Sequence, residues 1–198
     1  MKPDYFEYLK NRSSARLFLR KLFLQPIAKY FSGKVLDIGA GIGEFLELYP
    51  DATGVDIDKH CVSYCNSRGL NCVQGDIYNL PFEDNSFDGI LLNNILEHLD
   101  SPAEAFFEIK RVLKNKGKLM IELPGRKGFY FDKTHVKFWE KDEVVQFLGK
   151  RGFQEIRAIY FPVPFKAAGA FLTHNKLRVF AVNAKKDIVD RSRDNKGN

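Results

Sequence analysis

The chain has 198 residues, of which 44% are hydrophobic and 28% charged, and its formal net charge is +6. This length and composition are ordinary for one globular domain with a sizeable core, and the basic balance permits an acidic partner without requiring one. No apolar run approaches the roughly 20 residues that cross a bilayer, and the start MKPDYFEYLKNR lacks the apolar stretch of a secretory signal.

The chain contains three cysteines, Cys61, Cys65 and Cys72. Their odd number and the lack of CxxC spacing argue against a disulfide framework and a zinc site. We expect buried free thiols in a protein of the reducing cytosol. The sequence predicts no metal site.

Residues 1–31 mix charged side chains with apolar ones at helical spacing, among them Leu17, Phe23 and Ile27. The pattern predicts an N-terminal helical cap of one or two amphipathic helices, broken near Pro26. The basic residues of this segment favour a solvent-facing surface. A phosphate or nucleic-acid contact and a substrate lid remain open as alternatives.

From Lys34 onward, short apolar runs alternate with helical patterns. The predicted strands are Lys34–Ile38, Ala52–Val55, Asn71–Gln74, Phe87–Leu92, Lys118–Leu123, Phe153–Phe161 and Leu177–Ala184. The predicted helices are Gly43–Tyr49, Lys59–Arg68, a segment that begins after Ser101 and ends at Gly117, and Glu140–Lys150. Ser101, Pro102 and Glu104 predict a capping box at the third of these helices. The tail 185–198 is charged, lacks aromatic residues and is expected to be disordered.

Strands that alternate with helices predict an α/β fold over residues 32–184, with a mainly parallel sheet covered on both faces. The last two strands have no helical pattern between them, so we expect them to pair antiparallel at one edge. Ligands of such sheets bind beyond the carboxyl ends of the strands. The unusual residues gather at these ends: Asp37 to Gly43, Asp56, Asp76 and Asn93.

The stretch VLDIGAGIGEFL, residues 35–46, follows the first predicted strand with a glycine-rich turn. A dinucleotide turn reads G-x-G-x-x-G and holds pyrophosphate at a helix N-terminus. Here Glu44 takes the place of the third dinucleotide glycine. A carboxylate at that place would repel pyrophosphate, and Asp37 adds negative charge. The turn therefore favours a cationic cofactor without phosphates, such as S-adenosylmethionine.

Acids at the next two strand ends suit the nucleoside part of the same cofactor. Asp56 could accept both ribose hydroxyls, and Asp76 could accept from the adenine amino group. The glycines let backbone pack against the cofactor without an intervening Cβ. A plainer interpretation stays open for each acid, because an aspartate at a strand end also caps turns.

Four stretches together resemble a known family. They are VLDIGAGIGEFL, GVDID at 54–58, GDIYNLPFEDNSFDGILLNNILEHL at 75–99 and RVLKNKGKLMIELP at 111–124. In this order, from about Lys34 to Phe153, the chain is similar to class I S-adenosylmethionine-dependent methyltransferases of the small-molecule branch. The resemblance implies a Rossmann-like three-layer sandwich whose seven-stranded, mostly parallel sheet has an antiparallel last strand. It also implies S-adenosylmethionine as cofactor and S-adenosylhomocysteine as product.

The resemblance further implies roles for the positions that match the family's motifs. Asp37 and the turn Gly39, Ala40 and Gly41 would surround the methionine part of the cofactor. The nucleoside and the methionine end would be contacted by Asp56 at the ribose, Ile57 beside the adenine, Asp76 and Ile77 at the adenine edge, and Asn93 after the fourth strand.

The stretch DKTHVKFWE, residues 132–140, is a candidate acceptor site. His135 follows the exit of the fifth strand and should overhang the carboxyl edge of the sheet. Histidine ordinarily titrates near pH 6.5, which suits proton removal around neutral pH. The alternative is that His135 only fixes its own loop, with Phe138 and Trp139 as core anchors.

Three other segments could contribute to the site. His98, in the pair Glu97–His98, could contact substrate or serve local hydrogen bonding. The apolar segment Phe161–Phe171, stiffened by prolines, could roof an acceptor pocket or be a plain packing loop. Tyr8 and Arg12 could reach the carboxylate of the cofactor.

The predicted function is methyl transfer from S-adenosylmethionine to O or N of a small molecule, such as a sugar, an amine or another metabolite. A tRNA or rRNA methyltransferase is an alternative, although NNIL at 93–96 replaces the (D/N)PP(Y/F) turn of many base-amino methylases. A catalytically silent, cofactor-binding regulatory protein is another. A nicotinamide dehydrogenase is a further alternative that Glu44 weakens.

Overall fold

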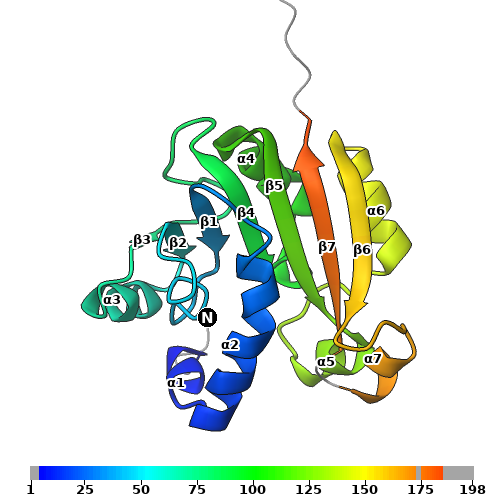
Figure 1. Ribbon diagram of the computed structural model, residues 1–198, viewed down its shortest axis with the longest axis horizontal. Coiled ribbons are helices and arrows are strands. Elements are labelled where there is room, and N and C mark those ends of the chain that lie inside the picture. Colours follow the sequence, from blue (N-terminus) through cyan, green and yellow to red (C-terminus); the bar gives the residue numbers. More distant parts are fainter. Residues whose placement is uncertain (1–4, 173–174, 185–198) are drawn as a thin grey trace, which may run out of the picture.

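The computed structural model describes residues 5–172 and 175–184. Seven strands form one sheet in the order β3-β2-β1-β4-β5-β7-β6, with helices on both faces (Figure 1). The strands are β1 (Val35–Ile38), β2 (Ala52–Asp56), β3 (Cys72–Gln74), β4 (Phe87–Asn93), β5 (Leu113–Pro124), β6 (Phe153–Phe161) and β7 (Lys176–Asn183). The helices are α1 (Tyr5–Lys10), α2 (Ser14–Ala28), α3 (Lys59–Ser67), the 3-10 helix η1 (Leu96–His98), α4 (Pro102–Val112), α5 (Arg126–Phe131), α6 (Lys141–Gly149) and α7 (Ala168–Phe171).

The sheet is parallel from β3 to β5 and antiparallel around β7. Val35 of β1 pairs in parallel with Ala52 of β2 and with Gly89 of β4. β7 runs antiparallel to β5 on one side and to β6 on the other. The predicted Rossmann-like sandwich with a reversed last strand is therefore confirmed.

Each face of the sheet carries its own hydrophobic core, because successive strand residues point to opposite faces. On one face Ile90 and Leu92 of β4 pack with Ile109 of α4. On the other face Leu91 packs with Ile27 of α2. Figure 1 shows α2 in front of the sheet and α4 and α6 behind it. Full burial of each such side chain stabilises the fold by about 1.5–3 kcal/mol.

The N-terminal segment departs from the prediction at Pro26. Two helices are present, but the break between them lies at residues 11–13, where Ser13 caps α2 by accepting from the Arg16 N–H at 3.4 Å. Pro26 lies in the last turn of α2, which ends at Ala28. A proline there removes one helical hydrogen bond close to the end of the helix, and the helix is not interrupted.

The predicted helix Gly43–Tyr49 is wrong, since this segment is a series of turns. Its bonds alternate between two spacings: the N–H groups of Glu47 and Tyr49 reach four residues back, and that of Leu48 reaches three. Gly43, at φ +80°, holds the start of the segment outside helical geometry.

The predicted capping box on α4 is also wrong as a hydrogen-bonded unit. Ser101 is the N-cap residue, but its side chain makes no capping bond. Its backbone N–H donates to the Tyr78 hydroxyl at 3.2 Å, which takes the donor that Glu104 would have used. α4 ends at Val112 and β5 begins at once, so Gly117 lies inside a strand and does not end the helix.

The carboxyl ends of the parallel strands and of β6 meet at one edge, shown at the bottom of Figure 1, where α1, α5 and α7 also lie. All three cysteines are buried free thiols, as predicted. In the described parts of the chain, no helix has the length and apolar character that a membrane crossing needs. The predicted disordered tail lies outside the described residues.

Candidate functional site

The glycine turn after β1 needs glycine for two reasons. Gly39, Gly41 and Gly43 all have positive φ, between +54° and +80°, a region that other residues seldom adopt. Space is also short, because a Cβ on Gly39 would lie 2.1 Å from Ile95 Cδ1. The N–H groups of Gly39 and Ala40 both donate to the Val55 carbonyl, which fastens the turn to the end of β2.

Asp56, at the end of β2, holds the turn through its carboxylate. Oδ2 accepts from the Gly41 N–H at 2.7 Å, and Oδ1 accepts from the Asp58 N–H at 2.9 Å. The side chain is buried, and burial raises its pKa despite these two bonds. Each oxygen keeps a second lone pair for a ribose hydroxyl. Asp56 thus has the plainer turn-capping role, and its ribose role stays a prediction.

Asp37 lies within β1 and is only 4% exposed. Burial, together with the negative charges of Asp56 and Glu44, raises its pKa to about 8, although the positive charge of Arg20 acts in the opposite direction. The carboxyl group is therefore mostly protonated at neutral pH when no cation faces it. The expectation that Asp37 adds fixed negative charge to the turn needs correction, because its charge depends on a cationic partner.

Glu44 does not present a free carboxylate to the turn. Arg20 Nε lies 2.6 and 2.8 Å from its two oxygens, and Arg12 Nη1 lies 3.3 Å away. Two guanidinium groups thus compensate the charge that was expected to repel pyrophosphate. The same pairing engages Arg12, which was expected near the cofactor carboxylate, while Tyr8 is largely exposed.

The predicted adenine-side residues lie along the same edge. Asp76 and Ile57 are exposed, and Ile77 is half-buried against the core. Asp76 Oδ1 accepts from the Tyr78 N–H at 3.0 Å. Asn93 ends β4, with its Oδ1 accepting from the Asn94 side chain at 2.9 Å. Their contacts with cofactor stay predictions.

Leu9 of α1, which was not singled out in the sequence, covers the glycine turn. It is 3% exposed and packs with Ile42 and Cys61. A Cβ on Gly41 would lie 3.1 Å from Leu9 Cδ1. The first helix therefore borders the predicted cofactor site directly, as the substrate-lid alternative requires.

His135 lies at the carboxyl edge, as predicted, between α5 and α6. Its Nδ1 lies 2.7 Å from the Phe129 carbonyl oxygen, and its ring stacks on the Phe129 ring at 5.0 Å. A carbonyl only accepts, so Nδ1 carries the proton and Nε2 keeps a lone pair. Nε2 lies 3.8 Å from Oε1 of Glu97.

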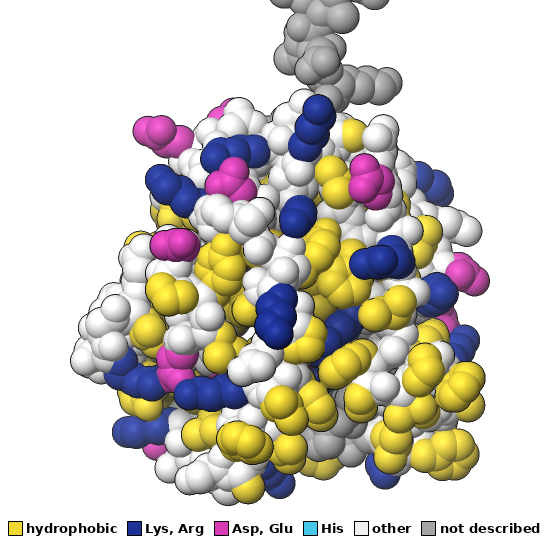
Figure 2. All heavy atoms as spheres, in the orientation of Figure 1, with side chains coloured by type: hydrophobic (Ala, Val, Ile, Leu, Met, Phe, Trp, Pro, Cys, Tyr) yellow, Lys and Arg dark blue, Asp and Glu magenta, His cyan; other side chains and the backbone are white. Residues whose placement is uncertain are grey.

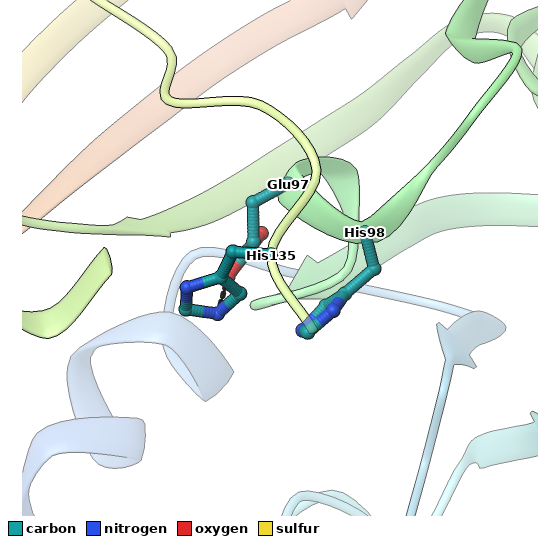
Figure 3. Close-up of side chains that lie close together, drawn as sticks. All are labelled: Glu97, His98 and His135. Carbon is teal, nitrogen blue, oxygen red and sulfur yellow. Dashed lines mark ion pairs between the residues drawn. The ribbon is translucent and has the colours of Figure 1, made fainter. Parts of the chain in front are cut away.

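Glu97 and His98 stand beside His135, on η1 (Figure 3). The rings of His98 and His135 are 4.6 Å apart. Glu97 is 1% exposed, and neither carboxylate oxygen has a hydrogen-bond partner among the described residues. Burial raises its pKa to about 8. The Glu97 side chain was not predicted as part of the site, since nothing in the sequence pairs position 97 with position 135.

A second charged group, also not predicted, lies at the same edge. Glu122 of β5 is buried between Lys176 and Arg178 of β7, at 2.5 and 2.7 Å. Burial alone would raise the pKa of Glu122, but the two cations hold it below its ordinary value. Arg178 also donates to the Phe23 carbonyl of α2 at 2.8 Å, so this group ties the N-terminal helix to the sheet.

A cavity of about 390 Å³ opens beyond the ends of β5 and β6. Trp139 and Tyr160 form part of its wall, and Lys166, Gly169 and Ala170 belong to the segment expected to roof an acceptor pocket. The buried Nε1–H of Trp139 has no hydrogen-bond partner among the described residues. Figure 2 shows apolar side chains gathered over this corner, around α5 and α7.

Comparison with known proteins identifies the family. A family model described as a methyltransferase domain matches residues 36–121. An uncharacterized protein of Methanocaldococcus jannaschii is 34% identical over 137 residues, which cover 64% of this chain and 67% of that protein. A demethylmenaquinone methyltransferase of Renibacterium salmoninarum is 32% identical over 108 residues, or 52% of this chain and 46% of that enzyme. The chain thus spans about half to two thirds of these relatives.

The fold agrees with that family. The crystal structure of a SAM-dependent methyltransferase from Archaeoglobus fulgidus superimposes with a TM-score of 0.71 at 24% identity, covering 84% of this chain and 94% of the other. The chain belongs to the class I S-adenosylmethionine-dependent methyltransferases. This membership confirms the predicted family and its cofactor.

Proposed function

We propose that this protein transfers the methyl group of S-adenosylmethionine to an oxygen or nitrogen atom of a small molecule with an apolar part. The observation that carries the proposal is that the hydrogen bond of His135 Nδ1 leaves a lone pair on Nε2. Because Nδ1 donates to the Phe129 carbonyl, Nε2 is free to accept a proton at the sheet edge that also bears the glycine turn.

The reaction needs few groups, because the sulfonium already activates the methyl carbon. The acceptor O–H or N–H gives its proton to His135 Nε2, and its electron pair attacks the methyl carbon. The carbon–sulfur bond breaks, and sulfur keeps that pair in S-adenosylhomocysteine. Positioning the two reactants in line supplies much of the rate enhancement. Asp37, Asp56 and the glycine turn would hold the cofactor, with Asp76, Ile57, Ile77 and Asn93 around it.

The cavity beyond the ends of β5 and β6, which Phe138 and Trp139 of the His135 loop help to line, supports a small acceptor. Its volume of about 390 Å³ falls within the range of ordinary ligand sites. Its wall is mostly apolar, which suits an acceptor with an apolar part. Because one relative is a demethylmenaquinone methyltransferase, hydroquinones and phenols are the first acceptors to try.

The test is transfer of radiolabelled methyl from S-adenosylmethionine to hydroquinones, phenols, amines, sugars and tRNA. Label in a small-molecule product supports the proposal, and label in tRNA alone would replace it with the nucleic-acid alternative. With the acceptor found, His135→Ala should lower turnover by roughly 100-fold or more and leave cofactor affinity unchanged. His60→Ala, an exposed histidine on α3, is the matched control and should turn over like the wild type.

A further inference from the structure

Glu97, His98 and His135 bring three metal-ligating side chains together in a way that the sequence does not reveal. One ligand atom from each lies within 4.8 Å of the others. Glu97 and His98 come from η1, and His135 comes from the loop before α6 (Figure 3). Among the described residues, no other group of three histidine, cysteine or acidic side chains meets this spacing.

The Glu97 carboxylate is the first sign that a ligand belongs here. It is 1% exposed, and both of its oxygens lack hydrogen-bond partners among the described residues. A buried polar group without a partner costs free energy, and a buried charge costs more. By contrast, the backbone carbonyl of the same residue accepts from the N–H groups of Val136 and Lys137, so the main chain around it is well held.

The two imidazoles are oriented as metal-bound imidazoles are. His135 Nδ1 donates to the Phe129 carbonyl at 2.7 Å, and His98 Nδ1 donates to the Thr134 carbonyl at 3.2 Å. The Thr134 hydroxyl, also beside His98 Nδ1, donates to Asp132 and so acts as an acceptor toward the ring. Metal-bound histidines usually anchor their second nitrogen on such acceptors. Both Nε2 atoms therefore carry lone pairs.

We propose that Glu97, His98 and His135 bind a divalent first-row transition ion through one carboxylate oxygen and two Nε2 atoms. Two imidazoles and a carboxylate suit Zn²⁺ or Fe²⁺ better than Mg²⁺ or Ca²⁺. In a tetrahedral site with bonds of about 2.0–2.2 Å the ligand atoms lie ~3.4 Å apart. Of the three pairs of ligand atoms, Glu97 Oε1 and His135 Nε2 at 3.8 Å are close to this spacing, and all three atoms lie within 4.8 Å of one another.

Three protein ligands leave one position open, as in catalytic zinc sites. At the acceptor edge, that position would take an acceptor oxygen, and the ion would acidify it as a Lewis acid. This part of the inference rests on the proposed function. His135 Nε2 can therefore either bind the ion or act as the base, but not both at once, because a metal-bound Nε2 cannot accept the proton.

The test uses the full chain after treatment with a chelator, titrated with Zn²⁺ by calorimetry and with Co²⁺ by visible absorption. We expect one ion per chain, with Co²⁺ bands of a four- or five-coordinate site. Glu97→Gln, which keeps the side-chain shape, and His98→Ala should each weaken Zn²⁺ binding at least ten-fold. His60→Ala should bind like the wild type. Far-ultraviolet circular dichroism checks that each variant is folded.

Two outcomes would overturn the metal site: binding well below one ion per chain, or Glu97→Gln binding Zn²⁺ as tightly as the wild type. Titration with S-adenosylmethionine in chelator keeps the two proposals apart. If the cofactor binds and methyl transfer continues in chelator while Zn²⁺ does not bind, only the metal inference fails. If Zn²⁺ binds at one per chain but no acceptor is methylated in its presence or absence, the metal site stands and the proposed function fails.

Discussion

The two halves of the carboxyl edge treat their acidic side chains differently. On the glycine-turn side, Asp56 accepts two backbone N–H groups and Glu44 is held by two arginines. On the histidine side, Glu122 has two cations, while Glu97 is buried without a hydrogen-bond partner among the described residues. In the first half, the acidic side chains of Asp56 and Glu44 already have their partners within the protein. The second half leaves both carboxylate oxygens of Glu97 without a hydrogen-bond partner among the described residues, and this is where we propose that the acceptor chemistry takes place.

The buried charges of the second half should give the largest effect on stability. Glu122→Gln leaves Lys176 and Arg178 without a counter-charge in the interior, so the free energy of unfolding should fall by about 3–5 kcal/mol. Urea denaturation measures it. The control is Glu143→Gln, whose partner Lys137 is 44% exposed, and there the loss should be about 0–1 kcal/mol. Equal losses in both variants would mean that the buried group does not hold α2 and β7 as described.

The glycine turn of the first half should be the next most sensitive. In Gly39→Ala, alanine must adopt the left-handed backbone conformation of this position, which costs about 1–2 kcal/mol. Its Cβ would also lie 2.1 Å from Ile95 Cδ1. Gly69→Ala is a matched control, because φ is +73° against +74° but nothing lies within 4 Å of the added Cβ. Thermal melts should show a clearly greater loss for Gly39→Ala, and only this variant should lose cofactor affinity. Equal melting temperatures would contradict the close-packing account of the turn.

Sequence patterns predicted where the strands of the first half lie, because that feature is local. The strand ends that carry Asp37, Asp56 and Asp76 could be found from short apolar runs followed by acids. A helix was wrongly predicted for Gly43–Tyr49. The apolar residues of this segment pack onto the core while its backbone forms turns, and apolar periodicity alone does not distinguish such turns from a helix. The charge of Glu44 was misjudged because its partners, Arg12 and Arg20, lie on another element.

The second half depended on contacts between distant residues. His135 could be placed at the edge from its position after the fifth strand. Its neighbour Glu97 could not, because only folding brings η1 and the loop before α6 together. The Glu122–Lys176–Arg178 group was hidden for a similar reason, since its members pair across β5 and β7. Side-chain partners across the sheet need three-dimensional information that a single sequence does not carry.

The smallest expected effect is the release of protons from Asp37 when the cofactor binds. The pKa of Asp37 is raised to about 8 in the free protein, and a cationic cofactor lowers it. Binding at pH 7 should therefore release protons, and affinity should rise with pH up to about 8. The free energy of unfolding of the free protein should change with pH in the opposite direction to the cofactor affinity. The folded state holds this proton more tightly than the unfolded chain, so the free energy of unfolding should fall between about pH 4 and pH 8.

Calorimetry in two buffers of different ionisation enthalpy counts the released protons. Asp37→Asn has no proton to release, so the release should disappear in this variant and its affinity should no longer follow pH. An unchanged proton release in Asp37→Asn would assign the effect to another group and remove Asp37 from the methionine end of the cofactor.

The central claim is that the two halves serve one reaction with separate tasks, cofactor binding at the turn and acceptor chemistry at the histidines. Calorimetric titration of S-adenosylmethionine into Asp56→Asn and His135→Ala tests it most directly. We predict at least ten-fold weaker binding for Asp56→Asn, which loses hydrogen bonds to a charged group, and wild-type affinity for His135→Ala. Wild-type affinity in Asp56→Asn, or an equal loss in both variants, would contradict the division.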